Sequence, residues 1–544
     1  MNMAYNTNTF FALFLPFAML IYQVTKKKYR WVALLLSSIV FFMLISNMLI
    51  GFAFLTTLFT YAGALFIEDT LTAKKLKKSA ENIDESSTSK TQDLKKRLTK
   101  EEKQLRKRIA KRYMILAIVL VVSILVVLKY SNFFIMIVNN VFALTRTKNE
   151  ISYLKLFVPI GISFYTMQAI GYLVDVYFGR IEAEKNFFKL FLFMIFFPTL
   201  MEGPICRWTD LNNQLFEGKS INSDSFINGF IRIVWGLFKR MVISDRLNAA
   251  IIFFYKPSAS YTGLMIFICM LVTTIQLYME FSGTIDIVIG TARIFNIKLP
   301  ENFKQPFLAK SAAEFWRRWH ISLGTWFKNY IFYPVSTSSL MKKWNKYGRK
   351  HCGKYLTNVV ISAIALFPVW MLNGLWHGPQ TTYIMYGVYY FVILLLEVAI
   401  EPVGTMFWNR IGFDENGKLV SGFKMVRTWM IILIGEMLFR ANSLKAFGIM
   451  MKNMFTAPYD GDFFSGKIFE IGLDAADYIV AIIGIIIVFA VELKMEKNPE
   501  YLENIPKLST PKRWAIYYAL ILAIVIFGAY GAGYQPADLI YAGF

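Results

Sequence analysis

The sequence predicts an all-α protein whose helices cross a membrane many times. Apolar residues make up 56% of the 544-residue chain and aromatic residues 17%, and the mean hydropathy is +0.45. Apolar runs recur along the whole chain at about 17 to 22 residues, the length that a helix needs to cross a bilayer. We therefore expect a polytopic transmembrane helical bundle of about 11 to 13 spans, placed in the cell membrane as a multi-pass protein.

The distribution of charge also fits a membrane protein. In a soluble protein, the formal net charge of +23 would suggest nucleic acid as a partner. Here Lys and Arg gather in loops between apolar runs, for example at Lys26 to Arg30 and at Lys328 to Lys354, as the positive-inside rule expects. The expected partner is thus the lipid bilayer and not nucleic acid, and the basic loops are expected in the cytoplasm.

Three regions differ in composition. Residues 1–67 hold the first transmembrane spans, residues 68–112 form a loop rich in Lys, Arg, Glu and Ser, and residues 113–544 hold the other spans and the expected catalytic core. The basic loop is expected in the cytoplasm, and its second half, Thr91 to Arg112, resembles a charged surface helix. The loop is either a solvated hairpin or a docking arm for a cytosolic protein or anionic lipid.

Two further stretches depart from the pattern of a plain span. Leu156 to Tyr177 is apolar but is broken by Pro159 and Gly161. Phe226 to Phe254 carries charged residues at intervals that a span would not tolerate. We interpret this second stretch as an interfacial or buried amphipathic helix.

No pattern in the sequence predicts a bound metal or cofactor. No His, Cys, Asp and Glu cluster has zinc spacing, and there is no Walker-type phosphate loop and no G-x-S-x-G motif. The cysteines are far apart and are expected to be free thiols: Cys206, Cys269 and Cys352. Three isolated acids among apolar residues either bind a cation or pair with nearby arginines: Asp175, Glu202 and Asp286.

Two of the three histidines are the strongest candidates for chemistry. His320 and His377 each lie in a Trp-rich segment beside long apolar runs, whereas His351 lies in a basic loop and is expected to be solvated. Histidine has the side-chain pKa nearest neutrality, which suits it to proton transfer. An ionisable residue among membrane spans is also a functional candidate by default.

The segment around His320 predicts a single helix. Ser311 and Glu314 have the spacing of a capping box, and a helix from Ala312 would stack Trp316 over His320. Neighbouring cations would lower the pKa of the histidine. Other aromatic and basic residues surround it in the sequence: Trp319, Trp326, Arg317, Arg318 and Lys328. The alternative is an interfacial helix with an aromatic belt, in which His320 is only one of several side chains that end in a polar group.

The segment around His377 predicts the end of a transmembrane helix. Gly378 and Pro379 terminate the helix, and Gly374, one turn earlier, allows another part of the chain to approach closely. A histidine inside a helical bundle can activate a hydroxyl group as a general base. The alternative is a core histidine that is hydrogen-bonded to a backbone carbonyl.

Short motifs along nearly the whole chain resemble those of the membrane-bound O-acyltransferase (MBOAT) superfamily. They are most similar to its bacterial branch that O-acetylates alginate, with the D-alanyl transferases of teichoic acid as a related branch. The motifs are Phe197-Pro198 with Gly203-Pro204-Ile205 and Arg207, Phe281-Ser282-Gly283 with Asp286, Leu299-Pro300-Glu301-Asn302-Phe303, Phe315 to Trp326, Gly374 to Gly378, and Phe439-Arg440-Ala441.

This resemblance implies a ring-like helical bundle with a central funnel or tunnel that converges on His377. His377 takes the catalytic histidine position of the family, and His320 takes its second functional polar position. The path of donor and acceptor is then expected to be lined by Trp316, Arg317, Arg318, Trp319, Trp326, Asn373, Trp376 and Asp286.

The activity that the resemblance implies is O-acyl transfer. We expect an acetyl group from acetyl-CoA, a donor substrate and not a bound cofactor, to reach an extracytoplasmic polysaccharide through an exported SGNH-type acetyltransferase or esterase. The alternatives are D-alanyl transfer from an acyl carrier protein to teichoic acid, and transport of a glycan or lipid, although no internal repeat favours a transporter. Tyr333 to Ser336 differs from the alginate branch, so the glycan stays open.

Overall fold

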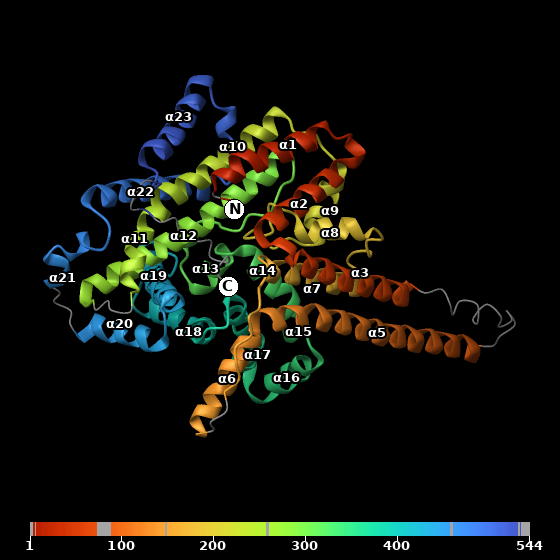
Figure 1. Ribbon diagram of the computed structural model, residues 1–544. Helices are drawn as coiled ribbons and strands as arrows, with labels where there is room; N and C mark the ends of the chain where they lie inside the picture. The colour runs from red at the N-terminus through yellow and green to blue at the C-terminus, as the bar shows by residue number, and fades with distance from the viewer. Residues whose placement is uncertain are drawn as a thin grey trace. The chain divides into compact units, whose positions relative to one another are not determined.

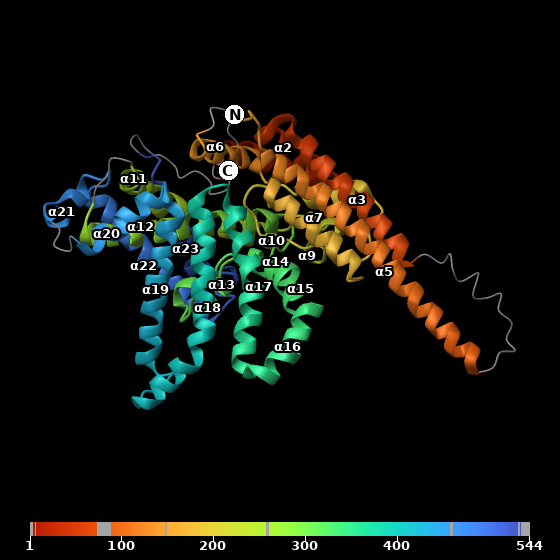
Figure 2. The same ribbon diagram turned by 90° about the horizontal axis from the view of Figure 1, so that it is seen from below.

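The computed structural model consists of helices and loops, and no strand occurs among the residues that it describes (Figures 1 and 2). These residues are 4–5, 7–72, 89–146, 150–256, 261–456, 461–530 and 534. The all-α class predicted from the sequence is therefore confirmed. Residues 73–88, in the first half of the predicted basic loop 68–112, lie outside the described residues.

The chain divides into two compact units. The first comprises mainly Phe14–Met201 and Ile205–Gly218, and the second comprises mainly Lys219–Phe544 together with Ala4–Leu13 and Glu202–Pro204. The helices of the first unit are α1 (Leu15–Val24), α2 (Arg30–Ser46), α3 (Ile50–Thr72), α5 (Ser89–Leu125), α6 (Ser131–Leu144), α7 (Ile162–Tyr177), α8 (Phe187–Ile195) and α9 (Trp208–Glu217).

In the first unit, α3 and α5 run side by side (Figure 2). Helix α5 joins the charged stretch Thr91 to Arg112 to the apolar run that follows, so the predicted surface helix and the next span form one continuous helix. Glu102 and Arg106 form an i,i+4 ion pair of 2.5 Å on it. Helix α7 begins only after Gly161, which has a left-handed backbone (φ 80°), so the break predicted there is confirmed.

The second unit holds the remaining helices and both histidine segments. They are α10 (Ser223–Leu237), α11 (Asp245–Phe254), α12 (Gly263–Ile294), α13 (Ala312–Arg318), α14 (Ile321–Phe327), α15 (Tyr333–Ser336), α16 (Ser339–His351), α17 (Gly353–His377), α18 (Thr381–Arg410), α19 (Lys418–Arg440), α20 (Leu444–Thr456), α21 (Gly461–Phe464), α22 (Ala475–Lys497) and α23 (Thr510–Phe527).

The charged stretch Phe226 to Phe254 forms a continuous helical segment, since a π-helical turn joins α10 to α11. This segment packs along α12 (Figure 1), and three of its charged residues, Arg232, Lys239 and Arg240, pair with carboxylates on that helix. Asp286 on α12 binds Arg232 at 2.7 Å and Lys239 at 3.0 Å. The prediction of a buried amphipathic helix is therefore confirmed, as is the pairing of Asp286 with an arginine.

Helices α10 and α12 approach closely at glycines that are spaced seven residues apart. A Cβ atom added to Gly236 would lie 2.4 Å from the carbonyl oxygen of Gly283, and one added to Gly290 would lie 2.5 Å from that of Gly229. Small residues at such positions let the backbones of membrane helices come together. The absence of side chains at these four positions therefore fixes the distance between the two helices.

Gly236→Ala is expected to lower the thermal stability of the protein. The added methyl group would meet backbone atoms that cannot move aside, and overpacking of this kind costs about 1–3 kcal/mol. Gly422→Ala on α19 is the matched control because nothing lies within 4 Å of its added Cβ atom, so this change should be neutral or slightly stabilising. Thermal unfolding in detergent checks this, and equal unfolding midpoints for the two variants would contradict it.

Seven segments of the described chain are long and apolar enough to cross a membrane. They are Lys27–Thr72, Lys100–Leu144, Gly263–Ile294, Gly353–His377, Thr381–Trp408, Ala475–Lys497 and Thr510–Phe527. The number is below the expected count because neighbouring runs merge, as in α12, and because other helices are shorter, such as α7 with 16 residues. The prediction of a multi-pass membrane protein is confirmed.

Candidate active site

His320 lies at a break between two short helices. Helix α13 ends at Arg318, Trp319 is extended (φ −109°, ψ 131°), and His320 has a left-handed backbone (φ 47°, ψ 51°) before α14 begins at Ile321. The prediction of one helix that stacks Trp316 over His320 is therefore wrong. This backbone conformation costs a residue other than glycine about 1–2 kcal/mol, so neighbouring contacts must hold His320 in place.

Asn302 supplies these contacts. Its backbone oxygen accepts a hydrogen bond from the N–H of Ile321 at 2.9 Å. Its side-chain oxygen accepts bonds from the N–H and the hydroxyl of Ser322, both at 2.9 Å, and lies 3.3 Å from Nδ1 of His320. The N–H of Ser322 can only donate, which identifies the acceptor atom as the amide oxygen. Nδ1 of His320 therefore carries the proton, and the lone pair lies on Nε2.

Burial lowers the pKa of His320 to about 3. The neighbouring cations that were expected to lower it are not the cause, because Arg317 and Lys328 are exposed and Arg318 is bound to carboxylates. Removing an imidazole from water disfavours its charged form. His320 is thus neutral at physiological pH and can accept a hydrogen bond through Nε2.

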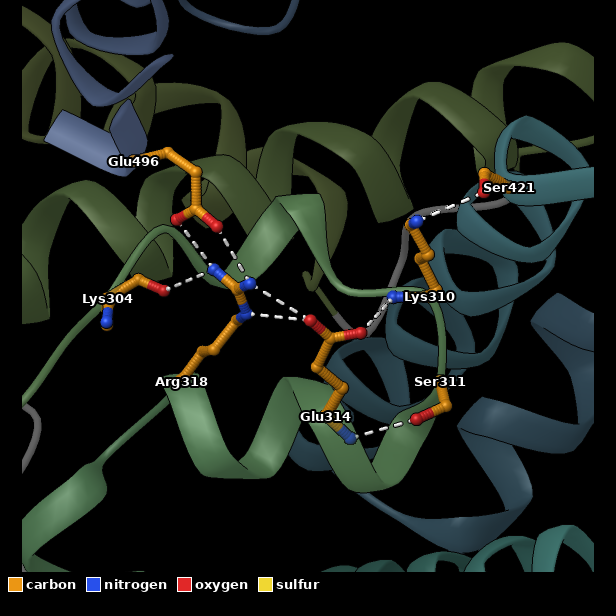
Figure 3. Close-up of polar contacts among 7 residues, drawn as sticks. All are labelled: Lys304, Lys310, Ser311, Glu314, Arg318, Ser421 and Glu496. Atoms are coloured by element: carbon orange, nitrogen blue, oxygen red, sulfur yellow. Dashed lines mark hydrogen bonds and ion pairs between the residues drawn. The ribbon is translucent and has the colours of Figure 1, made fainter. Parts of the chain in front are cut away.

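The N-terminal end of α13 is anchored to α18. The hydroxyl of Ser311 accepts a hydrogen bond from the N–H of Glu314 at 3.0 Å, as the capping-box spacing predicts (Figure 3). The two carboxylate oxygens of Glu397 on α18 accept bonds from the N–H groups of Ala312 and Ala313 at 2.8 and 3.0 Å. A carboxylate at this end of a helix satisfies N–H groups that have no partner within the helix.

The C-terminal end of α13 is anchored to α22 through Arg318. The guanidinium group binds both oxygens of Glu496 at 2.8 and 2.9 Å, Glu314 at 3.0 Å and the backbone oxygen of Lys304 at 3.3 Å (Figure 3). The other oxygen of Glu314 accepts a bond from the N–H of Lys310 at 2.9 Å. Bidentate arginine–carboxylate contacts are geometrically specific, so α13 holds a defined position directly before His320.

His377 is the last residue of α17. The helix ends there because Gly378 has a φ of 154° and is followed by Pro379, as the sequence predicts. A Cβ atom added to Gly374 would lie 2.4 Å from the carbonyl oxygen of Tyr383 on α18, which confirms the close approach expected at this glycine. Helix α18 can therefore pack against the end of α17, and His377 is only 7% exposed.

His320 and His377 line one cavity of about 340 Å³. Its wall is mostly aromatic and apolar, and consists of Leu277, Phe281, Trp316, Trp319, His320, Leu323, His377, Tyr386, Glu436 and Phe439. The ring of Trp376 contacts both imidazoles, with centroids 5.6 Å from His320 and 4.9 Å from His377. The structure thus brings both predicted histidines together with three of the predicted tryptophans.

Other residues expected along the path do not line this cavity. Arg317 is exposed, and Trp326 is buried against Tyr330 with ring centroids 5.3 Å apart. Asn373 is buried on α17, one turn before His377. Asp286 lines a different cavity, of about 380 Å³, where its ion pairs with α10 lie.

Three residues of the site were not identified from the sequence. Asn302 orients His320, and the available signal was its place in the Leu299 to Phe303 motif. Tyr386 on α18 and Glu436 on α19 both line the cavity, and the hydroxyl of Tyr386 donates a hydrogen bond to Glu436 at 3.2 Å. The only signal for Glu436 was an acid in an apolar run, three residues before the Phe439 motif.

The fold is that of a multi-pass membrane protein, and its second unit holds two buried imidazoles in one aromatic cavity. Residues 181–348 match the model of the MBOAT, membrane-bound O-acyltransferase family. The chain is thus an O-acyltransferase that carries an MBOAT domain. The matched residues include His320, and His377 lies beyond their end.

Named relatives agree with this class. The chain is 29% identical to the probable alginate O-acetylase AlgI of Pseudomonas aeruginosa, over 84% of this chain and 75% of that protein. It is 30% identical to the peptidoglycan O-acetyltransferase of Helicobacter pylori, over 53% of this chain and 55% of that protein. It is also 30% identical to the teichoic acid D-alanyltransferase of Bacillus subtilis, over 46% of this chain and 60% of that protein. The resemblance drawn from the motifs is confirmed.

Proposed function

We propose that the protein transfers an acetyl group from acetyl-CoA for the O-acetylation of an extracytoplasmic polysaccharide, with His377 and His320 at the reacting centre. The observation that carries the proposal is the single cavity that both side chains line. The names of two relatives, an alginate O-acetylase and a peptidoglycan O-acetyltransferase, support acetyl as the group and a polysaccharide as its destination.

In the proposed step, His377 acts as the general base. It takes the proton of an acceptor hydroxyl while the hydroxyl oxygen attacks the acetyl carbonyl carbon. The new C–O bond forms, the thioester C–S bond breaks, and its electron pair leaves on the sulfur of CoA. The hydroxyl belongs either to the polysaccharide or to an exported SGNH-type partner that passes the acetyl group on.

In this scheme His320 positions the donor. Its neutral imidazole presents a lone pair on Nε2, which can accept a hydrogen bond from an amide N–H of the pantetheine arm of CoA. The aromatic side chains of Trp316 and Trp319 line the same space. An apolar wall of this kind excludes water, which would otherwise hydrolyse the thioester.

D-alanyl transfer from a carrier protein is the second candidate. It is favoured by the 30% identity to the teichoic acid D-alanyltransferase of Bacillus subtilis. Both reactions move an acyl group from a thioester to a hydroxyl, so the two histidines suit either of them. The donor is what separates the two candidates.

A direct test compares the two donors with purified protein. We expect radiolabelled acetyl-CoA to be consumed, with label transferred to an added polysaccharide or released as acetate. We expect a D-alanyl thioester on a carrier protein to be left intact under the same conditions. Consumption of the D-alanyl thioester alone would overturn acetyl as the transferred group and establish the second candidate.

A further inference from the structure

Helix α16 carries its positive charges along one exposed side. Residues three or four positions apart lie on the same side of a helix. Here they form a group of exposed cations, called the α16 basic face below, that continues into the start of α17: Lys342, Lys343, Lys346, Arg349, Lys350 and Lys354. The opposite side of α16 packs on α17, where a Cβ atom added to Gly348 would lie 2.7 Å from the side-chain oxygen of Thr357.

No carboxylate balances the α16 basic face. The sequence contains no Asp or Glu between Glu314 and Glu397. Among the residues that the structure describes, none of the six cations forms an ion pair. The charged helix α5 differs, since Arg106 pairs there with Glu102. The α16 basic face therefore carries uncompensated positive charge, which attracts an anionic ligand.

A stripe of apolar and aromatic side chains borders the α16 basic face. Leu340, Trp344 and Tyr347 have the spacing of residues on one side of a helix. Leu340 is 67% exposed and Tyr347 is 57% exposed, so the stripe is left uncovered by the rest of the described chain. Cations beside an exposed apolar stripe are typical of a helix at a membrane surface, where the cations reach lipid headgroups and the apolar side chains reach acyl chains.

The α16 basic face lies beside a candidate membrane span. Helix α16 packs along α17 (Figure 2), whose residues are long and apolar enough to cross a membrane. The contact between Gly348 and Thr357 places α16 beside the first turns of α17, whereas His377 lies at the far end of its 25 residues. The positive-inside rule predicts that the end with the basic residues faces the cytoplasm, and the cytoplasmic leaflet contains anionic lipids.

We propose that the α16 basic face binds the phosphate groups of anionic phospholipids, with the acyl chains against the stripe of Leu340, Trp344 and Tyr347. Two observations favour lipid over a soluble acidic protein: a membrane span lies directly beside the face, and the exposed stripe needs an apolar partner. Because exposed charges are screened by salt, the binding should weaken as ionic strength rises. The inference does not depend on the function proposed above.

A triple variant with Lys346→Gln, Arg349→Gln and Lys350→Gln tests the charge. The purified full-length protein in neutral detergent is titrated with phosphatidylglycerol, which is anionic, or with phosphatidylcholine, which has no net charge. Native mass spectrometry counts the bound lipid. We expect the wild type to prefer phosphatidylglycerol, and the triple variant to lose at least about tenfold in affinity for it, since each Lys or Arg near the surface adds to the attraction.

Two further variants separate charge from structure. Exchanging the same residues for the other basic type (Lys346→Arg, Arg349→Lys and Lys350→Arg) keeps the charge and should keep the affinity. The matched control removes three exposed cations from a loop that also contains carboxylates, and is the combination of Lys497→Gln, Lys507→Gln and Lys512→Gln. Its affinity for phosphatidylglycerol should stay within about twofold of the wild type.

A second measurement locates the lipid at α16 in the unaltered basic face. The protein is reconstituted in phosphatidylcholine vesicles that contain an equal share of either brominated phosphatidylglycerol or brominated phosphatidylcholine, and bromine quenches the fluorescence of nearby tryptophans. The difference between the wild type and Trp344→Phe isolates the signal of Trp344. We expect brominated phosphatidylglycerol to quench this signal more strongly, and high salt to remove the difference.

Three results would overturn the inference. Equal affinity of the triple variant and the matched control for phosphatidylglycerol would show that the α16 basic face does not bind it. Equal quenching of Trp344 by the two brominated lipids would leave the face to a soluble acidic partner, and this result decides the question if the triple variant does not fold. Displacement of phosphatidylglycerol by equimolar glycerol 3-phosphate or acetyl-CoA would identify a soluble phosphate compound as the ligand.

Discussion

Replacing His377 with alanine is expected to abolish acyl transfer while the protein stays folded in the membrane. Alanine is compatible with the last turn of α17, and the change removes the proposed proton acceptor from the cavity. Loss of a general base typically costs about 10²- to 10⁴-fold in rate. The measurement is transfer or hydrolysis of radiolabelled acetyl-CoA by the purified variant.

His351→Ala is the matched control for this experiment. His351 is exposed at the end of α16, as the sequence predicts, so its loss should leave activity unchanged. Thermal unfolding of both variants separates a loss of chemistry from a loss of folding. The assay must be chemical, because a transporter would also lose its function in cells. Turnover by His377→Ala close to the wild-type rate would show that the general-base role is wrong.

The features predicted correctly from the sequence are those that depend on local chemistry. The length of the apolar runs and the basic loops between them identified a multi-pass helical protein. Single residues identified several helix ends: Gly378 ends α17, Gly161 precedes α7, and Ser311 caps α13. In each case the residue's own backbone preference or its own side chain decides the outcome.

The features predicted wrongly depend on contacts between distant residues. Local spacing predicts an unbroken helix through His320, but Asn302, 18 residues earlier in the chain, holds a left-handed break there. The sequence places cations beside His320, yet the fold exposes Arg317 and binds Arg318 to α22. Burial lowers the histidine pKa instead, and burial is a property of the tertiary structure.

For two further residues, the surroundings of the side chain depend on the direction in which the helix faces. The resemblance places Asp286 on the expected path of donor and acceptor, whereas its place among arginines predicts an ion pair. The structure shows the ion pair, with Arg232 on α10. Glu436 is one acid in an apolar helix, and nothing local marks it. Its place on the same helical face as Phe439 became meaningful only once that face was found against His377.

His320→Ala is expected to impair use of the donor more than the chemical step. The lost hydrogen bond lies in a buried site, where such a loss costs about 1–3 kcal/mol, or about 5- to 150-fold in kcat/KM for acetyl-CoA. Saturating acetyl-CoA should therefore restore much of the rate. Because burial lowers the pKa of His320 to about 3, its imidazole stays neutral, and the defect should be equal between about pH 5 and 8. Initial rates over a range of donor concentrations at several pH values check this. A defect that persists at saturating donor and deepens toward acidic pH would assign His320 to proton transfer instead.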